Sequence, residues 1–379
     1  MSPGLVGWDE RQGLAEQVRE LDLQLSATTA RLEAIKPPQA PGTFQDLKDQ
    51  IAGAAKQRSI KIKELRDDIA KGPAGDQYKR AEDLRAGVRA IAADCLALEQ
   101  SLTLRAQPPA RDICIAADGL LREYSTAVQK QRSHFVLISE AEHFGPYSAA
   151  VHLGYSGLSF WSLSKTAHEF GHLWAADDSF CGGLQDAFLE NHSDDWSEPH
   201  RKELFADLVA VYVLGPAFAF ASLLLDFSPA VTNLGETHPT GDQRAHCVLY
   251  ALEATLERHQ PLHKPTVQGA HQQLLKFWTQ ARSAGGWKIE LPHADDLQYA
   301  VDLSIGRLWD KLPQAMYSSI PQANSVRNRL ANPGQTGPAV RCRDVVNGAW
   351  LARYSNPQES TEIGARALSM GVLAGGTKP

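Results

Sequence analysis

His168-Glu169-Phe170-Gly171-His172 is the stretch of this 379-residue chain that constrains its fold most strongly. Two histidines four residues apart lie one turn above each other on the same face of an α-helix. Both imidazole rings can therefore reach one Zn²⁺ ion, and Glu169 stands beside them as a base for a water molecule. The pattern predicts a helix that carries two metal ligands and a general base, with Ser164 as a candidate cap at its start.

A catalytic zinc ion usually has a third protein ligand, and two acidic residues compete for that position. Asp178 has the offset used by metzincins, but their pattern requires a glycine where this chain has Ala175. Glu203 lies on a second predicted helix, which is the gluzincin arrangement. We favour Glu203, because it lies just before the apolar run 208–225 on the same predicted helix. A carboxylate at the edge of such a run needs a cationic partner. The alternative is a solvated acidic helix start, which the helix dipole also favours.

Asp207 lies one turn beyond Glu203 on the same helix face. A carboxylate at this position can accept the free ring N–H of a ligand histidine and so fix its tautomer. The sequence therefore predicts Asp207 as a support for the metal ligands and not as a ligand itself.

A third block, Thr237-His238-Pro239-Thr240-Gly241-Asp242-Gln243-Arg244, follows the second helix. The order HExxH, ExxAD and [ST]HPxxxxR resembles the HtpX-like heat-shock peptidases and the CAAX prenyl endopeptidases, over residues 160–250. This resemblance implies a gluzincin with Glu203 as the third ligand. It also implies that His238 and Arg244 lie near the metal, where they stabilise the oxyanion or brace the ligand carboxylates.

The relatives in that group are typically embedded in membranes, and this chain departs from them. Its candidate span, 208–225, is near the lower length limit for crossing a bilayer. Gly215-Pro216 interrupts the run, and Asp207 and Asp226 flank it. We therefore expect a buried core helix with a break and no stable membrane span.

Composition narrows the class of protein further. The net charge of −6 indicates no basic surface, so we expect no nucleic-acid partner. The N-terminus has no apolar signal core, and the five cysteines lack CxxC spacing, which together predict a cytoplasmic protein. Cys181 lies near the motif and is a candidate inhibitory fourth ligand, although a buried or loop thiol is the favoured interpretation.

Residues 1–107 differ from the rest of the chain because apolar residues repeat there at alternating spacings of three and four. Proline- and glycine-rich segments at 36–42, 71–75 and 107–109 divide this region into three predicted helices. We expect an antiparallel coiled-coil bundle. It either supports the rest of the protein or binds a partner or a second copy, and we favour the second role because long helical hairpins expose much surface.

The remaining chain is predicted to form a metallopeptidase core, 108–260, and a C-terminal helical region, 261–379, that packs on it. Helices beyond Arg244 are expected at 245–258, 268–284, 295–312, 339–354 and 361–373. Short strands are expected within 134–139 and 149–163, and a polar loop with solvated His192 and His200 within 177–200. Trp278, Trp287, Trp309 and Trp350 are expected in the core. The predicted fold is mainly α with a small β-sheet: a zincin-type gluzincin core preceded by the helical bundle.

The predicted function is a zinc-dependent endopeptidase that acts on protein or peptide substrates. In this hypothesis His168, His172 and Glu203 hold Zn²⁺, Glu169 is the general base, and His238 or Arg244 is the second oxyanion donor. The alternative is a catalytically inactive zincin-fold scaffold that acts as a coiled-coil interaction protein. A third hypothesis is a latent protease that a partner activates through residues 1–107.

Overall fold

The computed structural model describes thirteen segments: 10–36, 42–72, 76–108, 110–129, 135–139, 143–145, 150–154, 158–175, 197–231, 234–235, 238–286, 294–332 and 340–376. The chain divides into two compact units. The first comprises Met1–Leu104, Leu137–Ser139 and Gly145–Ala150, and the second comprises Arg105–Val136, Glu140–Phe144 and Val151–Pro379. All candidate metal ligands belong to the second unit.

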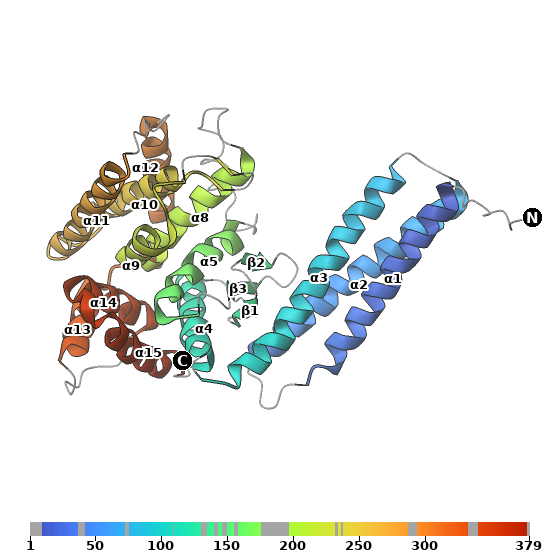
Figure 1. The fold of residues 1–379 in the computed structure, drawn as a ribbon, viewed down its shortest axis with the longest axis horizontal. Helices are drawn as coiled ribbons and strands as arrows, with labels where there is room; N and C mark the ends of the chain where they lie inside the picture. The colour runs from blue at the N-terminus through green and yellow to red at the C-terminus, as the bar shows by residue number, and fades with distance from the viewer. Residues whose placement is uncertain are drawn as a thin grey trace, which may run out of the picture. The chain divides into compact units, whose positions relative to one another are not determined.

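Three long helices account for most of the first unit: α1 (Glu10–Ala34), α2 (Gly42–Lys71) and α3 (Gln77–Arg105), drawn in blue and cyan in Figure 1. They begin and end at the predicted proline- and glycine-rich segments. Each helix buries apolar residues at the predicted heptad positions, for example Leu14, Val18, Leu21 and Leu25 on α1. Ion pairs join all three helices, including Arg31 with Glu99, Asp22 with Arg66, and Asp68 with Arg80.

The described residues are mainly helical with one small sheet, as the sequence predicts. Its strands are β1 (Leu137–Ser139), β2 (His143–Gly145) and β3 (Ala150–Gly154), in the order β1-β3-β2. Strands β1 and β3 lie within the two predicted segments but are shorter. Every residue of β3 is buried, including the polar His152.

The second unit is built around four helices: α4 (Ala110–Ala127), α5 (Lys165–Ala175), α8 (Glu198–Leu214) and α10 (Gly241–Leu256). Helix α5 carries the HExxH residues and follows directly on the 3₁₀ turn η2 (Phe160–Ser164). Ser164 lies directly before α5, and its hydroxyl donates to the carbonyl of Trp161 at 3.1 Å, so its capping role stays a prediction.

Helices α5 and α8 approach each other closely at Gly171. A Cβ atom at this position would lie 2.8 Å from the Cα atom and the carbonyl oxygen of Ala206. A glycine facing an alanine lets two helix backbones come together without a gap. Gly171 directly precedes His172, and Ala206 directly precedes Asp207. The close contact therefore brings the HExxH segment of α5 next to the segment of α8 that carries Glu203 and Asp207.

The predicted break in the apolar run is confirmed. Helix α8 ends at Leu214, and α9 (Pro216–Ala221) begins after Gly215, whose φ of 72° is a conformation that favours glycine. The break lies in the core: the described residues on both sides of it are buried, and η3 (Ser222–Asp226) follows as a short π-helical turn. None of the described helices is long and apolar enough to span a bilayer.

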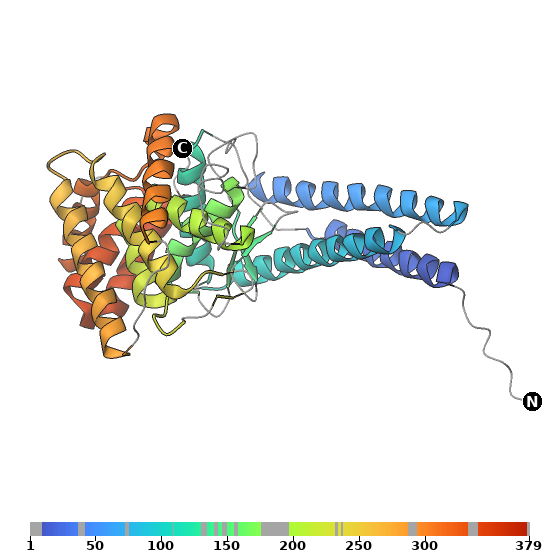
Figure 2. The same cartoon turned by 90° about the horizontal axis from the view of Figure 1, so that it is seen from above.

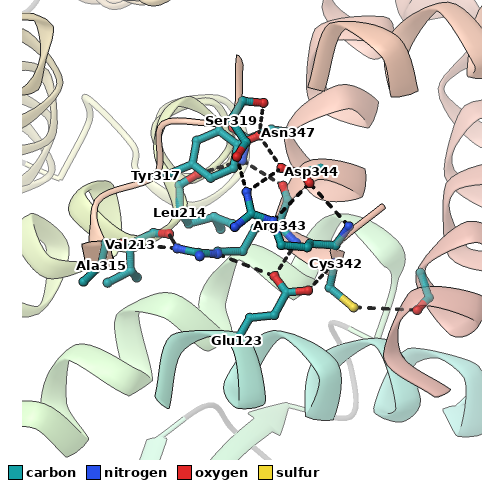
Figure 3. A network of polar contacts seen from close by, with 12 residues as sticks. Glu123, Val213, Leu214, Ala315, Tyr317, Ser319, Cys342, Arg343, Asp344 and Asn347 are labelled. Atoms are coloured by element: carbon teal, nitrogen blue, oxygen red, sulfur yellow. Dashed lines mark hydrogen bonds and ion pairs between the residues drawn. The ribbon is translucent and has the colours of Figure 1, made fainter. Parts of the chain in front are cut away.

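Polar side chains from α14 (Cys342–Ser355) complete the hydrogen bonds that this break leaves open (Figure 3). Asn347 donates to the carbonyl of Leu214 at 2.7 Å and accepts from the N–H of Ala217 at 3.0 Å, so it bonds both sides of the break. Arg343 donates to the carbonyl of Val213 at 3.1 Å. Its own backbone N–H donates to Glu123 on α4. The C-terminal region is therefore part of the support of α8.

Five helices make up the C-terminal region in the described residues: α11 (Lys264–Ala284), α12 (Ala294–Lys311), α13 (Ile320–Ala331), α14 and α15 (Ser360–Gly376). Figures 1 and 2 show them in orange and red, with α15 beside α4 and α13 beside α14. All except α13 were predicted. Trp278 and Trp350 are buried as expected, Trp309 is only partly buried, and Trp287 lies outside the described residues.

Candidate metal centre

His168 and His172 lie on one face of α5, as their spacing requires. Their Nε2 atoms are 3.1 Å apart, and the two rings are almost perpendicular. Glu169, between them in sequence, is buried with 6% of its surface exposed. The helix thus presents two imidazole nitrogens close together and a carboxylate that is shielded from bulk water.

Glu203 on α8 faces this histidine pair. Its Oε2 atom lies 3.4 Å from Nε2 of His168, and its Oε1 atom lies 3.2 Å from Nε2 of His172. Within the described residues, His168, His172 and Glu203 form the one group of three or more His, Cys, Asp or Glu side chains able to share a metal ion. The structure therefore brings the predicted third ligand to the predicted pair.

The spacing of these three donors fits a zinc ion. Tetrahedral zinc with bonds of about 2.0–2.1 Å to nitrogen and oxygen separates its ligand atoms by about 3.3 Å. The two Nε2 atoms are 3.1 Å apart, and Glu203 places one oxygen 3.2 Å from His172 and its other oxygen 3.4 Å from His168. One ligand atom from each residue lies within 4.8 Å of the other two. Two imidazoles and one carboxylate are also the donor set of catalytic zinc sites, which keep a fourth position open.

Asp207 supports the cluster from behind. Its Oδ1 atom lies 2.8 Å from Nδ1 of His168, and its side chain is fully buried. A carboxylate in this position holds the ring proton on Nδ1, which leaves the Nε2 lone pair directed toward His172 and Glu203. The predicted supporting position of Asp207 thus agrees with the geometry.

Arg244 lies in the first turn of α10 and is engaged by carboxylates. It donates from Nε and Nη2 to the two carboxylate oxygens of Asp207, both at 2.7 Å. Its Nη1 atom lies 3.7 Å from Oε2 of Glu203. Because a bidentate pair fixes the guanidinium, this geometry favours bracing of the carboxylates over donation to a substrate oxyanion.

The residues around Arg244 explain how α10 begins at this point. Thr240 and Gln243 form a capping box, with the N–H of Gln243 donating to the Thr240 hydroxyl at 3.1 Å. Asp242 accepts from Trp278 of α11 at 2.8 Å. A Cβ at Gly241 would lie 2.2 Å from the carbonyl oxygen of Ser228, so only glycine fits there. Each of these contacts fixes the start of the helix that carries Arg244.

His238 occupies the open side of the cluster. Its Nε2 atom lies 3.6 Å from Oε2 of Glu203, and 60% of its side chain is exposed. Among the described residues around Glu203, His238 is the one whose ring combines nearness to this ligand with access from solvent. Its position suits contact with a bound substrate.

Burial and charge act against each other throughout this cluster. Burial lowers the pKa of His168, but Asp207 and Glu203 outweigh it and raise that pKa to about 10. Burial raises the pKa of Glu203 and of Asp207, but neighbouring cations outweigh it and lower both values. For Asp207, the principal cation is Arg244. The cluster therefore keeps two carboxylates negative and favours a cation between them, either a proton or a metal ion.

Phe218 of α9 packs against the candidate ligand pair. Its ring is stacked on the imidazole of His168, with 6.4 Å between centroids and 7° between planes. Phe218 follows the Gly215 break and lies next to Ala217, which Asn347 holds. The break therefore turns the chain so that an aromatic side chain covers one face of a ligand.

Asp178, the competing ligand, lies outside the described residues, as do Cys181 and His192. The prediction of a solvated His200 is wrong. His200 lies in the first turn of α8, is buried, and contacts the carbonyl of Gly235 through Nε2 at 2.8 Å. Ser197 at the N-cap and a proline in the first turn were signals that the helix begins before this residue.

No protein-family model matches the chain, and no curated protein or solved structure shows significant similarity to it. The resemblance to the HtpX-like and CAAX prenyl endopeptidase group therefore stays a prediction from three short motifs. The candidate centre stands on the geometry of its own residues.

Proposed function

We propose that this protein is a zinc-dependent endopeptidase of the gluzincin type, with a zincin-type core formed by the helices around α5 and α8. One observation carries the proposal. One donor atom from each of His168, His172 and Glu203 lies within 4.8 Å of the other two, in the ligand set of catalytic zinc sites, beside the buried carboxylate of Glu169.

A zinc ion held by these residues would polarise the scissile carbonyl and lower the pKa of an attacking water toward about 7. Glu169 takes the proton of that water and delivers it to the leaving amine. His238 donates to the developing oxyanion from the exposed side of the cluster. Asp207 and Arg244 hold His168 and Glu203 in place, so the chemistry is divided between residues that react and residues that fix geometry.

The substrate class follows from the reaction: a protein or peptide that enters from the side where His238 is exposed. We further propose that the protein acts in the cytoplasm. Residues 1–107 are a candidate regulatory arm, because their three helices bury heptad positions and expose charged flanks. In that role the arm binds a protein partner or a second copy of the chain.

The proposal is tested by measuring zinc content and cleavage of an unfolded protein such as casein, in the wild type and in Glu169→Gln. We expect zinc in both proteins and a loss of turnover of about 10²–10⁴-fold in the variant, the usual contribution of a general base. Glu253→Gln is the matched control, because Glu253 lies exposed on α10. It should retain full activity.

Three outcomes would contradict the proposal. Wild-type protein without zinc removes the metal centre, and full turnover in Glu169→Gln removes the general base. A zinc-loaded wild type that cleaves nothing, with or without a partner of residues 1–107, favours the scaffold hypothesis. In that scaffold case, Glu203→Ala should lose folding and partner binding, and no peptidase phenotype should accompany the loss.

A further inference from the structure

His200 shares one face of α8 with Glu203 and Asp207, at positions i, i+3 and i+7. Glu203 and Asp207 contact His168 or His172, whereas no described bond joins His200 to either histidine. Its side chain is buried, with 5% of the residue exposed, and its Nε2 atom lies 2.8 Å from the carbonyl oxygen of Gly235. The helix that supplies the third ligand therefore also holds a backbone group close to His238 in sequence.

Gly235 is bonded directly to the backbone of His238. The N–H of Gly235 donates to the carbonyl of His238 at 3.0 Å. A second bond, from the N–H of Gly241 to the carbonyl of Val231 at 3.2 Å, joins the two flanks of the same stretch. His238 is thus fixed on one side by the start of α10 and on the other through Gly235, which His200 holds.

The chemistry of the contact defines the state of His200. A carbonyl oxygen only accepts, so Nε2 of His200 must carry the proton. Its Nδ1 atom is buried and has no hydrogen-bond partner. A buried imidazole with one satisfied nitrogen carries a desolvation cost, and the single contact that offsets it is the bond to Gly235.

We propose that His200 is a positioning residue for His238. It anchors Gly235 to α8, and the Gly235–His238 bond transmits this anchor to the exposed imidazole that faces Glu203. The proposal rests on the proposed function in that His238 is assigned to the oxyanion, but the anchoring itself does not depend on turnover. A displacement of about 1 Å in such a group can reduce the rate by as much as about 10²-fold.

The first test is a nuclear magnetic resonance measurement on the zinc-loaded protein, with the His238 ring signals assigned by their loss in His238→Ala. Two variants form a matched pair. His200→Gln retains an N–H donor, whereas His200→Met fills the space without one. We expect shifted or broadened His238 signals and faster amide exchange of Gly235 in the Met variant, and wild-type behaviour in the Gln variant.

The control for this pair is His259→Met, since His259 is also a buried imidazole whose Nδ1 has no hydrogen-bond partner, and it lies beyond the C-terminal end of α10, away from His238. It should leave the His238 signals unchanged. Unaltered His238 signals and Gly235 exchange in a folded His200→Met variant would overturn the proposal. If the Met variant does not fold, the wild-type tautomer decides: a proton on Nδ1 of His200 with none on Nε2 also overturns it.

A kinetic cycle tests whether His200 acts through His238. We expect His200→Met to reduce kcat by roughly tenfold and to change KM little, and the double variant with His238→Ala to be no slower than His238→Ala alone. Independent, multiplicative losses would contradict positioning. If the zinc-loaded wild type cleaves no protein while the His238 signals still depend on His200, the anchoring stands and the peptidase proposal falls.

Discussion

Asp207 is the shared partner of two neighbouring groups, the imidazole of His168 and the guanidinium of Arg244. One carboxylate oxygen is 2.8 Å from His168, and both oxygens accept from Arg244. The full burial of this side chain makes the electrostatic attraction strong and the loss of either partner costly. The identity of this one residue therefore affects both the stability of the fold and the tautomer of a ligand.

Asp207→Asn should weaken both properties. Removing the charge leaves Arg244 without its main counter-ion, which we expect to lower the free energy of unfolding by roughly 3–5 kcal/mol. The zinc dissociation constant of the folded fraction should rise by about 10–100-fold, as for other carboxylates that orient a ligand histidine. Denaturant titration and a competitive zinc chelator measure the two effects.

Asp226→Asn provides the comparison for that variant. Asp226 pairs with Lys165 at 3.1 Å, and both side chains are partly exposed. Because exposed ion pairs contribute about 0–1 kcal/mol, this change should have little effect on stability and none on zinc affinity. Equal zinc affinities of Asp207→Asn and the wild type would show that Asp207 does not orient a ligand.

The protonation of His168 predicts how the metal-free protein responds to pH. Its pKa is raised from 6.5 to about 10, so the stability that its proton contributes is fully present below pH 6.5 and is lost as the pH rises toward 10. With zinc on Nε2, no such proton is needed. Thermal unfolding should therefore show that zinc stabilises the protein increasingly over this interval.

The corresponding control is His168→Gln, which removes the titrating ring. In that variant the metal-free stability should lose its His168-dependent decline between pH 6.5 and 10. Parallel pH profiles for the zinc-loaded and metal-free wild type would contradict the assignment of His168 as a ligand.

At the scale of elements, the crossing of α5 and α8 sets the distance between the histidine pair and Glu203. Gly171→Ala should force the helices apart, because the added carbon would lie 2.8 Å from the backbone of Ala206. We expect a loss of about 1–3 kcal/mol in stability and weaker zinc binding. Gly269→Ala on α11 is the control, since a Cβ there meets nothing within 4 Å.

In the control variant the outcome should have the opposite sign. Replacing a helical glycine by alanine without steric conflict stabilises by roughly 0.5–1 kcal/mol. If Gly171→Ala behaved in the same way as Gly269→Ala, the close crossing of α5 and α8 would not be what limits the ligand distances.

The break between α8 and α9 makes Asn347 a residue of the site's framework. Asn347→Ala leaves the buried carbonyl of Leu214 and the N–H of Ala217 without this partner. Each unsatisfied backbone group should lower the free energy of unfolding by about 1–2 kcal/mol, which gives a total of about 2–4 kcal/mol. Asn328→Ala, on the exposed face of α13, should be nearly neutral. Denaturant midpoints of the two variants check this, and equal midpoints would contradict it.

Most helices could be predicted from periodicity, but α13 could not. Its buried residues, Ile320, Ala323, Val326 and Leu330, do follow helical spacing. Only three of them are large and apolar, and polar residues fill the positions between them, so local sequence gave a weak signal. The helix forms because α14 supplies the surface on which these side chains pack, as at Gly348, where a Cβ would lie 2.5 Å from Val326.

In the candidate site, too, the sequence predicts the arrangement within one helix but not the contacts between helices. The placement of His168, Glu169 and His172 relative to one another is a property of one helix, and the i, i+4 relation of Glu203 and Asp207 is a property of another. The approach of these two sets of residues to each other depends on the tertiary packing of α5 against α8 at Gly171. Likewise, the choice of Arg244 as a brace depends on its bidentate contact with Asp207, which no spacing in the sequence reveals.

At the scale of the whole molecule, every donor of the candidate centre belongs to the second unit. Leu47→Ala, a fully buried position on α2, should lower the stability of the first unit by about 2–5 kcal/mol. The zinc dissociation constant should remain unchanged. Circular dichroism melting and a zinc titration of the same sample test this separation, and a parallel loss of zinc affinity would refute it.

Asn347 also limits when the framework of the site can be completed. It lies 130 residues after Ala217, whose N–H it accepts. While a nascent chain is made from its N-terminus, α8 and α10 are therefore finished long before the amide that joins the two sides of the break exists. Until α14 emerges and docks, the backbone at Leu214 and Ala217 must bond to water or to temporary partners. During ribosomal synthesis, α8 and its candidate ligand Glu203 would therefore reach their final bonded state only after α14 has been translated.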